Sequence, residues 1–201
     1  MPPVSKEDRR AQILAAAREH FAERGYHATS VDDIVGRVGI ARGTFYLYYP
    51  DKKAIFGELV DRFSMRLGMA ILRVDPLDRA HPVGEQIREN IRRVLSVFLE
   101  DRMMAKIFIE DTLGIDDAFD AKLLGFYDEV GKMFVESLSD GERLGLVRPG
   151  DHRVSAYFAM GGVKELMVHI IKRGWSYDAD KLADRVFDFV ARGMLTDKID
   201  G

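Results

Sequence analysis

The side chains with the clearest chemical purpose lie between residues 29 and 52, where hydroxyl, guanidinium and ammonium groups follow one another closely. Side chains of these types are the ones that contact DNA phosphates and the edges of bases in a major groove. Arg42 carries a forked donor that can reach O6 and N7 of guanine. Gly43 has no side chain, so the backbone can approach a duplex closely. The candidate DNA-contacting residues are Thr29, Ser30, Arg42, Gly43, Thr44, Tyr46, Tyr48 and Lys52.

Two short helices joined by a tight turn would position these side chains. Ser30 is a typical N-cap residue, and Asp33 three positions later makes a partial capping box. Gly39 would end this first helix and permit a left-handed turn residue. The second helix would cover Ala41 to Leu47 and present its polar side chains outward. Apolar residues at helical spacing give the first helix one buried face: Val31, Ile34, Val35 and Val38.

The flanking residues have two possible uses each. Tyr46 points outward and could touch a base methyl group or a phosphate. Thr29 and Ser30 could cap the first helix or contact phosphate, and the two roles are compatible. Lys52 lies at the start of the next helix, where its ammonium and the helix N-terminal amides would hold a phosphate. Phe45 and Tyr49 are expected in the core.

The stretch from about Ile13 to Val60 resembles the N-terminal domain of the TetR family of transcriptional regulators. The resemblance implies that Thr44 and Tyr48 bond to phosphate, and that the last two helices form a four-helix dimer interface. It also implies a repressor that responds to a ligand. Gly36 and Ala41 depart from the family pattern, in which a Ser commonly caps the recognition helix. The matching pieces are Ala22-Glu23-Arg24-Gly25-Tyr26, Thr29-Ser30-Val31 with Ile34, Gly39-Ile40-Ala41-Arg42-Gly43-Thr44-Phe45-Tyr46, Tyr48-Tyr49 and Lys52-Lys53.

Helical periodicity runs through nearly the whole chain, and no alternating stretch demands a sheet. The predicted fold is all-α, with a three-helix N-terminal domain and about nine helices in total. We expect a helix-turn-helix DNA-binding domain at 1–50 and a helical ligand-binding and dimerisation domain at 51–201. The first helix should end at Gly25, and Gly141 to Asp151 should be a loop.

Composition is that of a globular protein: 47% of the 201 residues are hydrophobic and 31% are charged. The chain lacks cysteine, which excludes disulfides and thiolate chemistry. It has no uninterrupted run of 18 apolar residues, so no transmembrane helix is expected, and the N-terminus has no signal-peptide core. A cytoplasmic location is therefore predicted.

The net charge of −3 is unevenly distributed along the sequence. Up to residue 55 the chain has nine lysines and arginines against seven acidic residues, and the remainder has 21 against 26. The positive end is the one that carries the helix-turn-helix pattern. Because a local basic patch sets the attraction for phosphate, the overall negative charge does not exclude DNA as a partner.

The C-terminal helices are expected to serve assembly and ligand binding. Helix-turn-helix proteins usually dimerise to read two half-sites, so we expect a homodimer on a pseudo-palindromic operator in double-stranded DNA. Gly161 and Gly162 would allow close helix approach, in the core or across the dimer seam. The expected interface residues are Val163, Leu166, Met167, Ile170, Val186, Phe189 and Val190. A pocket for a hydrophobic small-molecule effector would be lined by Phe63, Leu67, Phe98, Phe108, Phe126, Tyr127, Phe134 and Tyr157.

Two other classes of function compete with this interpretation. A helical enzyme would need a nucleophile beside a base, and the sequence shows no such arrangement. The five histidines have no metal-ligand spacing, so neither a catalytic residue, nor a metal, nor a cofactor is predicted. A protein-interaction module that does not regulate transcription is the second alternative, although a surface that binds protein would be more apolar.

Overall fold

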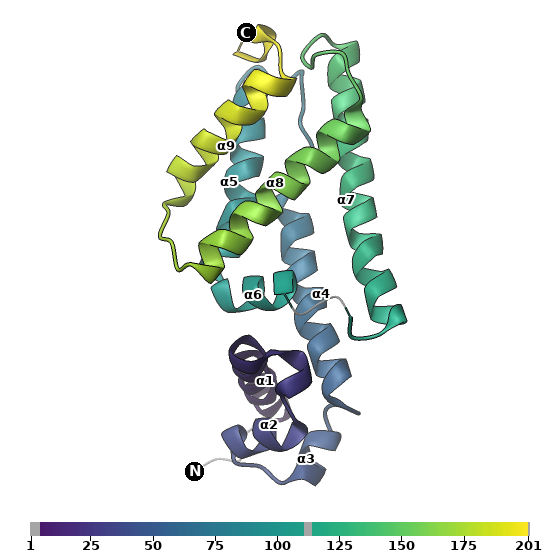
Figure 1. The fold of residues 1–201 in the computed structure, drawn as a ribbon, viewed down its shortest axis with the longest axis vertical. Coiled ribbons are helices and arrows are strands. Elements are labelled where there is room, and N and C mark those ends of the chain that lie inside the picture. Colours follow the sequence, from purple (N-terminus) through teal and green to yellow (C-terminus); the bar gives the residue numbers. More distant parts are fainter. Residues whose placement is uncertain (1–4, 111–113, 201) are drawn as a thin grey trace. The chain divides into compact units, whose positions relative to one another are not determined.

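The computed structural model describes residues 5–110 and 114–200, and these contain nine α-helices and no β-strand, which confirms the predicted all-α class. A single isolated β-bridge joins Val147 and Leu195. A short 3-10 helix, Asp197–Asp200, closes the described chain. The helices (Figure 1) are α1 Lys6–Ala28, α2 Val31–Val38, α3 Arg42–Tyr46, α4 Lys52–Ala70, α5 Val83–Glu100, α6 Arg102–Glu110, α7 Asp117–Arg143, α8 His152–Lys172 and α9 Ala179–Met194.

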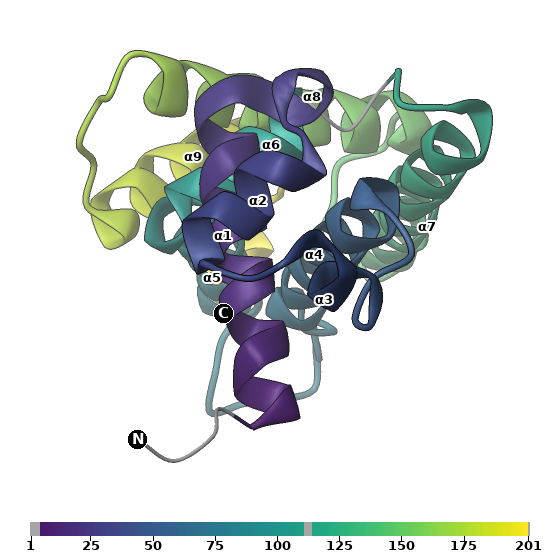
Figure 2. The same cartoon turned by 90° about the horizontal axis from the view of Figure 1, so that it is seen from below.

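The helices fall into two compact units. The first combines Met1–Met65 with Arg102–Asp120, and the second combines Arg66–Asp101 with Ala121–Gly201. The first unit therefore adds the start of α4 and all of α6 to the three N-terminal helices, which Figure 2 shows from below. Both α4 and α7 contribute residues to each unit.

Aromatic side chains build the core of the first unit. Phe21 of α1 and Phe56 of α4 are fully buried and meet edge to face, with ring centroids 5.1 Å apart. Phe119 at the start of α7 lies 5.5 Å from the Phe56 ring. The helical path of α1 breaks at Gly25, as predicted, because that residue takes φ 81°, and one further turn extends to Ala28.

In the second unit α5 packs along α9, as Figure 1 shows. The expected loop at Gly141 is wrong in part, since α7 continues through this residue to Arg143. Glycine is required there because a Cβ at position 141 would lie 2.5 Å from Val147 Cγ2. The buried residues that share this core are Leu138, Val147, Ala156, Phe187, Leu195 and Ile199.

Helix α8 is long and apolar enough to cross a membrane by length and composition, although only 17% of its apolar window is buried. The expectation of no transmembrane helix relied on an uninterrupted apolar run, whereas mean hydropathy over the window tolerates interruptions. The exposed apolar side chains of α8 form one wall of a groove in the second unit.

Candidate nucleic-acid interface

The candidate DNA-reading motif is the helix-turn-helix formed by α2, α3 and the turn between them. Its first helix, α2, begins at a complete capping box. Ser30 Oγ accepts from the backbone N–H of Asp33 at 3.1 Å, and the Asp33 carboxylate accepts from the backbone N–H of Ser30 at 2.8 Å. Hydrogen bonds from Ser30 lower the pKa of Asp33. Gly39 ends α2 in the left-handed region at φ 73°, as predicted. The capping role of Ser30 is therefore confirmed, and the tight turn after α2 fixes where α3 begins.

The inward side of α3 anchors it to the core. Phe45 is fully buried and Tyr49 is 3% exposed, which confirms the expectation that both are core residues. The Tyr49 hydroxyl donates to Glu58 of α4 at 2.9 Å, and Arg10 of α1 donates to both oxygens of the same carboxylate. Ala41 at the N-cap makes no side-chain hydrogen bond, so packing rather than capping holds this short helix.

The outward side of α3 presents the residues expected to meet a base edge. Arg42 and Tyr46 are exposed, with 46% of the Tyr46 surface accessible. Gly43 is exposed as well, and no atom of another segment lies within 4 Å of a Cβ built there. Thr44 and Tyr48 are partly buried at the sides of this face. The arrangement leaves room for the α3 backbone to approach a duplex.

Arg42 already has partners in the free protein. Its Nη1 lies 3.1 Å from a carboxylate oxygen of Asp32 on α2. Its Nε and Nη2 each lie 3.4 Å from the hydroxyl oxygen of Tyr46, one helical turn further along α3. Asp32 was not among the predicted site residues, because only the turn at Gly39 brings it opposite residue 42.

Thr29 has a structural role in the folded chain. It is 1% exposed, and its hydroxyl lies within hydrogen-bonding distance of two carbonyl oxygens, of Gly25 at 2.9 Å and of His20 at 3.1 Å. These contacts hold the last turn of α1 after the break at Gly25. A contact between Thr29 and phosphate remains a prediction.

Lys52 is also engaged by the protein itself. Its Nζ donates to the carbonyl oxygens of Tyr26 at 2.7 Å, Thr29 at 2.8 Å and His27 at 3.3 Å, and lies 4.4 Å from the Tyr26 ring centroid. Burial lowers the pKa of this ammonium. Lys52 thus ties the start of α4 to the end of α1, and its predicted phosphate contact is untested. The neighbouring Lys53 pairs with Asp116.

The eight residues expected to line a ligand pocket divide between the two units. Phe63 and Phe108 belong to the first unit, where both are buried with ring centroids 5.1 Å apart. The other six belong to the second unit, and Tyr157 is the most exposed of these at 45%. Leu67 and Phe98 are buried, whereas Phe126, Tyr127 and Phe134 are partly buried.

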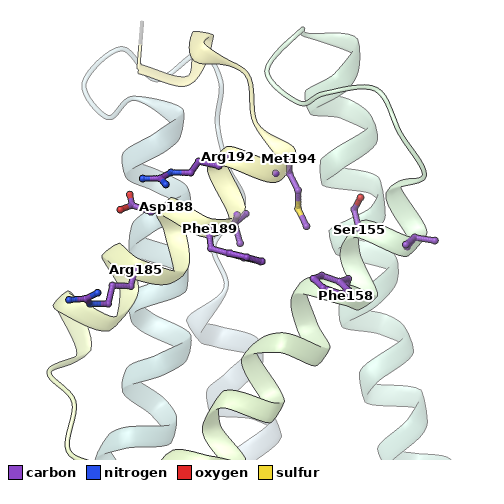
Figure 3. Close-up of a pocket in the computed structure, with 10 residues that line it drawn as sticks. Ser155, Phe158, Arg185, Asp188, Phe189, Arg192 and Met194 are labelled. Carbon is purple, nitrogen blue, oxygen red and sulfur yellow. The ribbon is translucent and has the colours of Figure 1, made fainter.

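A different hollow opens between α8 and α9 in the second unit, with a volume of about 750 Å³. Phe158 of α8 and Phe189 of α9 point toward one another across it, whereas Arg185 and Asp188 point away (Figure 3). Phe158 is 65% exposed and Phe189 is 69% exposed. We name this surface the α8–α9 face, and its lining residues are Val154, Ser155, Phe158, Arg185, Asp188, Phe189, Val190, Arg192, Gly193 and Met194.

The structure contradicts part of the predicted dimer interface. Met167 and Ile170 are fully buried in the single chain, so the expectation that they face a partner is wrong. Helical spacing alone could not decide which apolar stripe of α8 faces inward. Gly161 and Gly162 have no neighbouring segment within 4 Å of a Cβ position, so neither makes a close approach in the core.

The family model described as "Bacterial regulatory proteins, tetR family" matches residues 13–59, and this range contains the whole helix-turn-helix. Residues 13–59 therefore match the N-terminal DNA-binding domain of the TetR family. The proteins that this chain matches are transcriptional regulators, which favours that class of function over an enzyme and over a protein-interaction module without a role in transcription.

Curated relatives match this chain over about half to about nine-tenths of its length. The fatty acid metabolism regulator protein of Bacillus subtilis is 25% identical over 91% of this chain and 94% of its own. The transcriptional regulator EthR of Mycobacterium tuberculosis is 37% identical over 48% of this chain and 43% of its own.

Solved structures share the fold. A TetR-like regulator from Rhodococcus sp. RHA1 has a TM-score of 0.75 at 22% identity, covering 95% of this chain and 98% of that chain. The fatty acid degradation regulator FadR from Bacillus halodurans has a TM-score of 0.73 at 22% identity, covering 94% and 97%.

Proposed function

We propose that the protein is a cytoplasmic, homodimeric repressor that binds a pseudo-palindromic operator and leaves it when a hydrophobic small molecule binds. The observation that supports the operator contact is the two-sided character of the α3 region. Arg42, Gly43 and Tyr46 are exposed on its outward face. Phe45 and Tyr49 are buried on the opposite side and anchor the helix to the core. In this proposal residues 1–50 read DNA, and residues 51–201 bind the ligand and the second subunit.

Dimerisation through α8 and α9 is supported by what these helices expose. These two helices carry the exposed aromatic side chains Phe158 and Phe189, together with three glycines that have open space around them, at positions 161, 162 and 193. A monomer gains nothing from an exposed Phe189, whereas a second copy would remove that surface from water at about 25 cal/mol per Å². The glycines would let the helix backbones of two subunits approach closely.

A fatty acid, or a molecule with a similar long apolar chain, is the ligand class we propose. Two relatives that match over nine-tenths of the chain are named as regulators of fatty acid metabolism or degradation. The proposed lining residues are apolar or aromatic, as pockets for such ligands require.

Release from DNA follows from linkage between the two sites. A ligand can move the equilibrium only if it binds one dimer conformation better than the other, and DNA must favour the opposite one. Two recognition helices read successive major grooves only at the correct spacing. Helix α4 is the proposed lever, because it begins at Lys52 beside the helix-turn-helix and also carries Leu67, one of the proposed ligand-binding residues.

The test combines thermal shift with DNA release for saturated fatty acids of increasing chain length, and short-chain acids serve as the control. We expect long-chain acids to raise the unfolding temperature and to dissociate the protein from DNA that flanks its own gene. A long-chain acid that stabilises the protein but leaves the DNA complex intact would contradict the coupling. If no chain length stabilises the protein, the proposed ligand class is wrong.

A further inference from the structure

Arg42 is held on two sides before any DNA arrives. Arg42 Nη1 lies 3.1 Å from a carboxylate oxygen of Asp32. The Tyr46 hydroxyl oxygen lies 3.4 Å from both Nε and Nη2 of Arg42. All three groups are solvent-exposed, with side-chain exposures of 58% for Arg42 and 66% for Asp32. The pair is therefore on the surface that would face a duplex and not in the core.

The Asp32 contact involves only Nη1, and the Nε–Nη2 edge of the guanidinium holds only its contacts with the Tyr46 hydroxyl. A guanidinium has five N–H donors in a rigid plane, and adjacent donors on one edge bind two acceptors at once. The contacts of Nε and Nη2 with Tyr46 are longer than an ordinary N–H···O hydrogen bond. The Tyr46 oxygen thus occupies the place where the O6 and N7 acceptors of guanine would sit, and it is easily displaced.

The carboxylate of Asp32 has two opposing effects on DNA binding. An exposed negative charge beside the reading face repels phosphates, which weakens binding to every sequence. The same charge keeps Nη1 from turning to a phosphate, so the Nε–Nη2 edge remains directed at bases. A residue that weakens contact with all DNA while favouring contact with one base increases specificity by disfavouring the competitors.

We infer that Asp32 is a specificity-determining positioning residue, which acts through Arg42 to favour guanine over phosphate. This inference rests on the proposed role of Arg42 as the base-reading residue. It predicts an unusual signature for loss of the carboxylate. General DNA affinity should rise while discrimination between base pairs falls, whereas a damaged reading motif would lose both together.

The experiment uses the full-length protein and a pool of random duplexes from which the wild type selects its preferred site. Affinities are then measured for that site, for the site changed at its guanine positions, and for unselected DNA, at two salt concentrations. The variants are Asp32→Asn and Asp32→Ser, the latter because serine is well tolerated near a helix start. Glu23→Gln is the control, because Glu23 is an exposed acid of the same unit and the substitution removes the same charge.

For both Asp32 variants we expect discrimination at the guanine positions to fall by about two- to fivefold, the range that an exposed ion pair supports. Affinity for unselected DNA should rise. Glu23→Gln should leave discrimination unchanged. In the Arg42→Ala background, Asp32→Asn should have no further effect on discrimination, since the residue through which it acts is gone.

The possible failures are distinguishable. If Arg42→Ala loses discrimination but Asp32→Asn and Asp32→Ser retain it, the inference about Asp32 is overturned and the role of Arg42 stands. If Arg42→Ala itself retains discrimination, Arg42 does not read bases, and both proposals fall. Equal loss of specific and general affinity in the Asp32 variants would show a structural role only and would also overturn the inference.

Discussion

Replacing Lys52 by methionine separates two roles that the same ammonium could play. In the structure its Nζ is bonded to three carbonyl oxygens at the end of α1, at 2.7 to 3.3 Å. Methionine keeps much of the aliphatic length but cannot donate a hydrogen bond. The end of α1, which follows the break at Gly25, would then lose its tie to α4.

The expected effect is a loss of stability. A hydrogen bond to a charged group contributes about 1.5–3 kcal/mol. The Lys52 side chain is partly exposed, so water can replace some of these contacts in the variant. We therefore expect the free energy of unfolding of the first unit to fall by about 2 kcal/mol rather than by three full contributions. For a chain of this length, that corresponds to a decrease of about 4–8 °C in Tm.

Denaturant unfolding followed by circular dichroism measures this change, and Lys53→Met provides the matched control. Lys53 pairs with Asp116 at an exposed position, where ion pairs contribute little, so its variant should unfold like the wild type. The salt dependence of DNA binding gives the second measurement. A slope flatter by about 0.9 for each lost contact would show that Lys52 also binds phosphate on the operator. An unchanged free energy of unfolding for Lys52→Met would refute the structural tie.

Two further predictions concern assembly and pH. Phe189→Asp should give monomers in sedimentation and weaken operator binding. Gly162→Leu should also give monomers but keep the helical content of the wild type, since no other segment lies within 4 Å of its Cβ position. Dimers in either variant would count against dimerisation through α8 and α9. Burial is the first cause that raises the pKa values of Tyr26, Tyr49 and Tyr127 above 10.0. The folded state therefore holds these protons longer than the unfolded state, so their contribution to stability is complete below pH 10 and is lost as the pH rises further. Late ionisation of three tyrosines in an ultraviolet titration would support this, and ionisation of every tyrosine near pH 10 would contradict it.

Local signals in the sequence predicted the reading motif well. The capping pair at Ser30 and Asp33 and the turn at Gly39 depend on neighbours within a few residues, and the structure confirms each of them. Phe45 and Tyr49 were also expected in the core, and both are buried. Such features follow from helix geometry alone, which is why one sequence sufficed.

Contacts between segments could not be predicted in the same way. The carbonyl oxygens that engage Lys52 belong to residues more than 20 positions earlier, and only the packing of α4 against the end of α1 brings them together. The position of Asp32 beside Arg42 also depends on how two segments pack, so the sequence alone did not predict it. The side of α8 that faces the core could not be predicted either. Apolar residues lie on more than one side of this helix, and helical spacing does not say which side is buried.

The most direct test of the account is the affinity of the wild type and of Arg42→Ala for DNA that flanks the protein's own gene, measured against unselected competitor. A bidentate contact to guanine discriminates by about 5- to 150-fold, so the variant should lose affinity for the flanking DNA by that factor while its affinity for competitor falls much less. Equal affinities of the two proteins for the flanking DNA would contradict the claim that the outward face of α3 reads the operator.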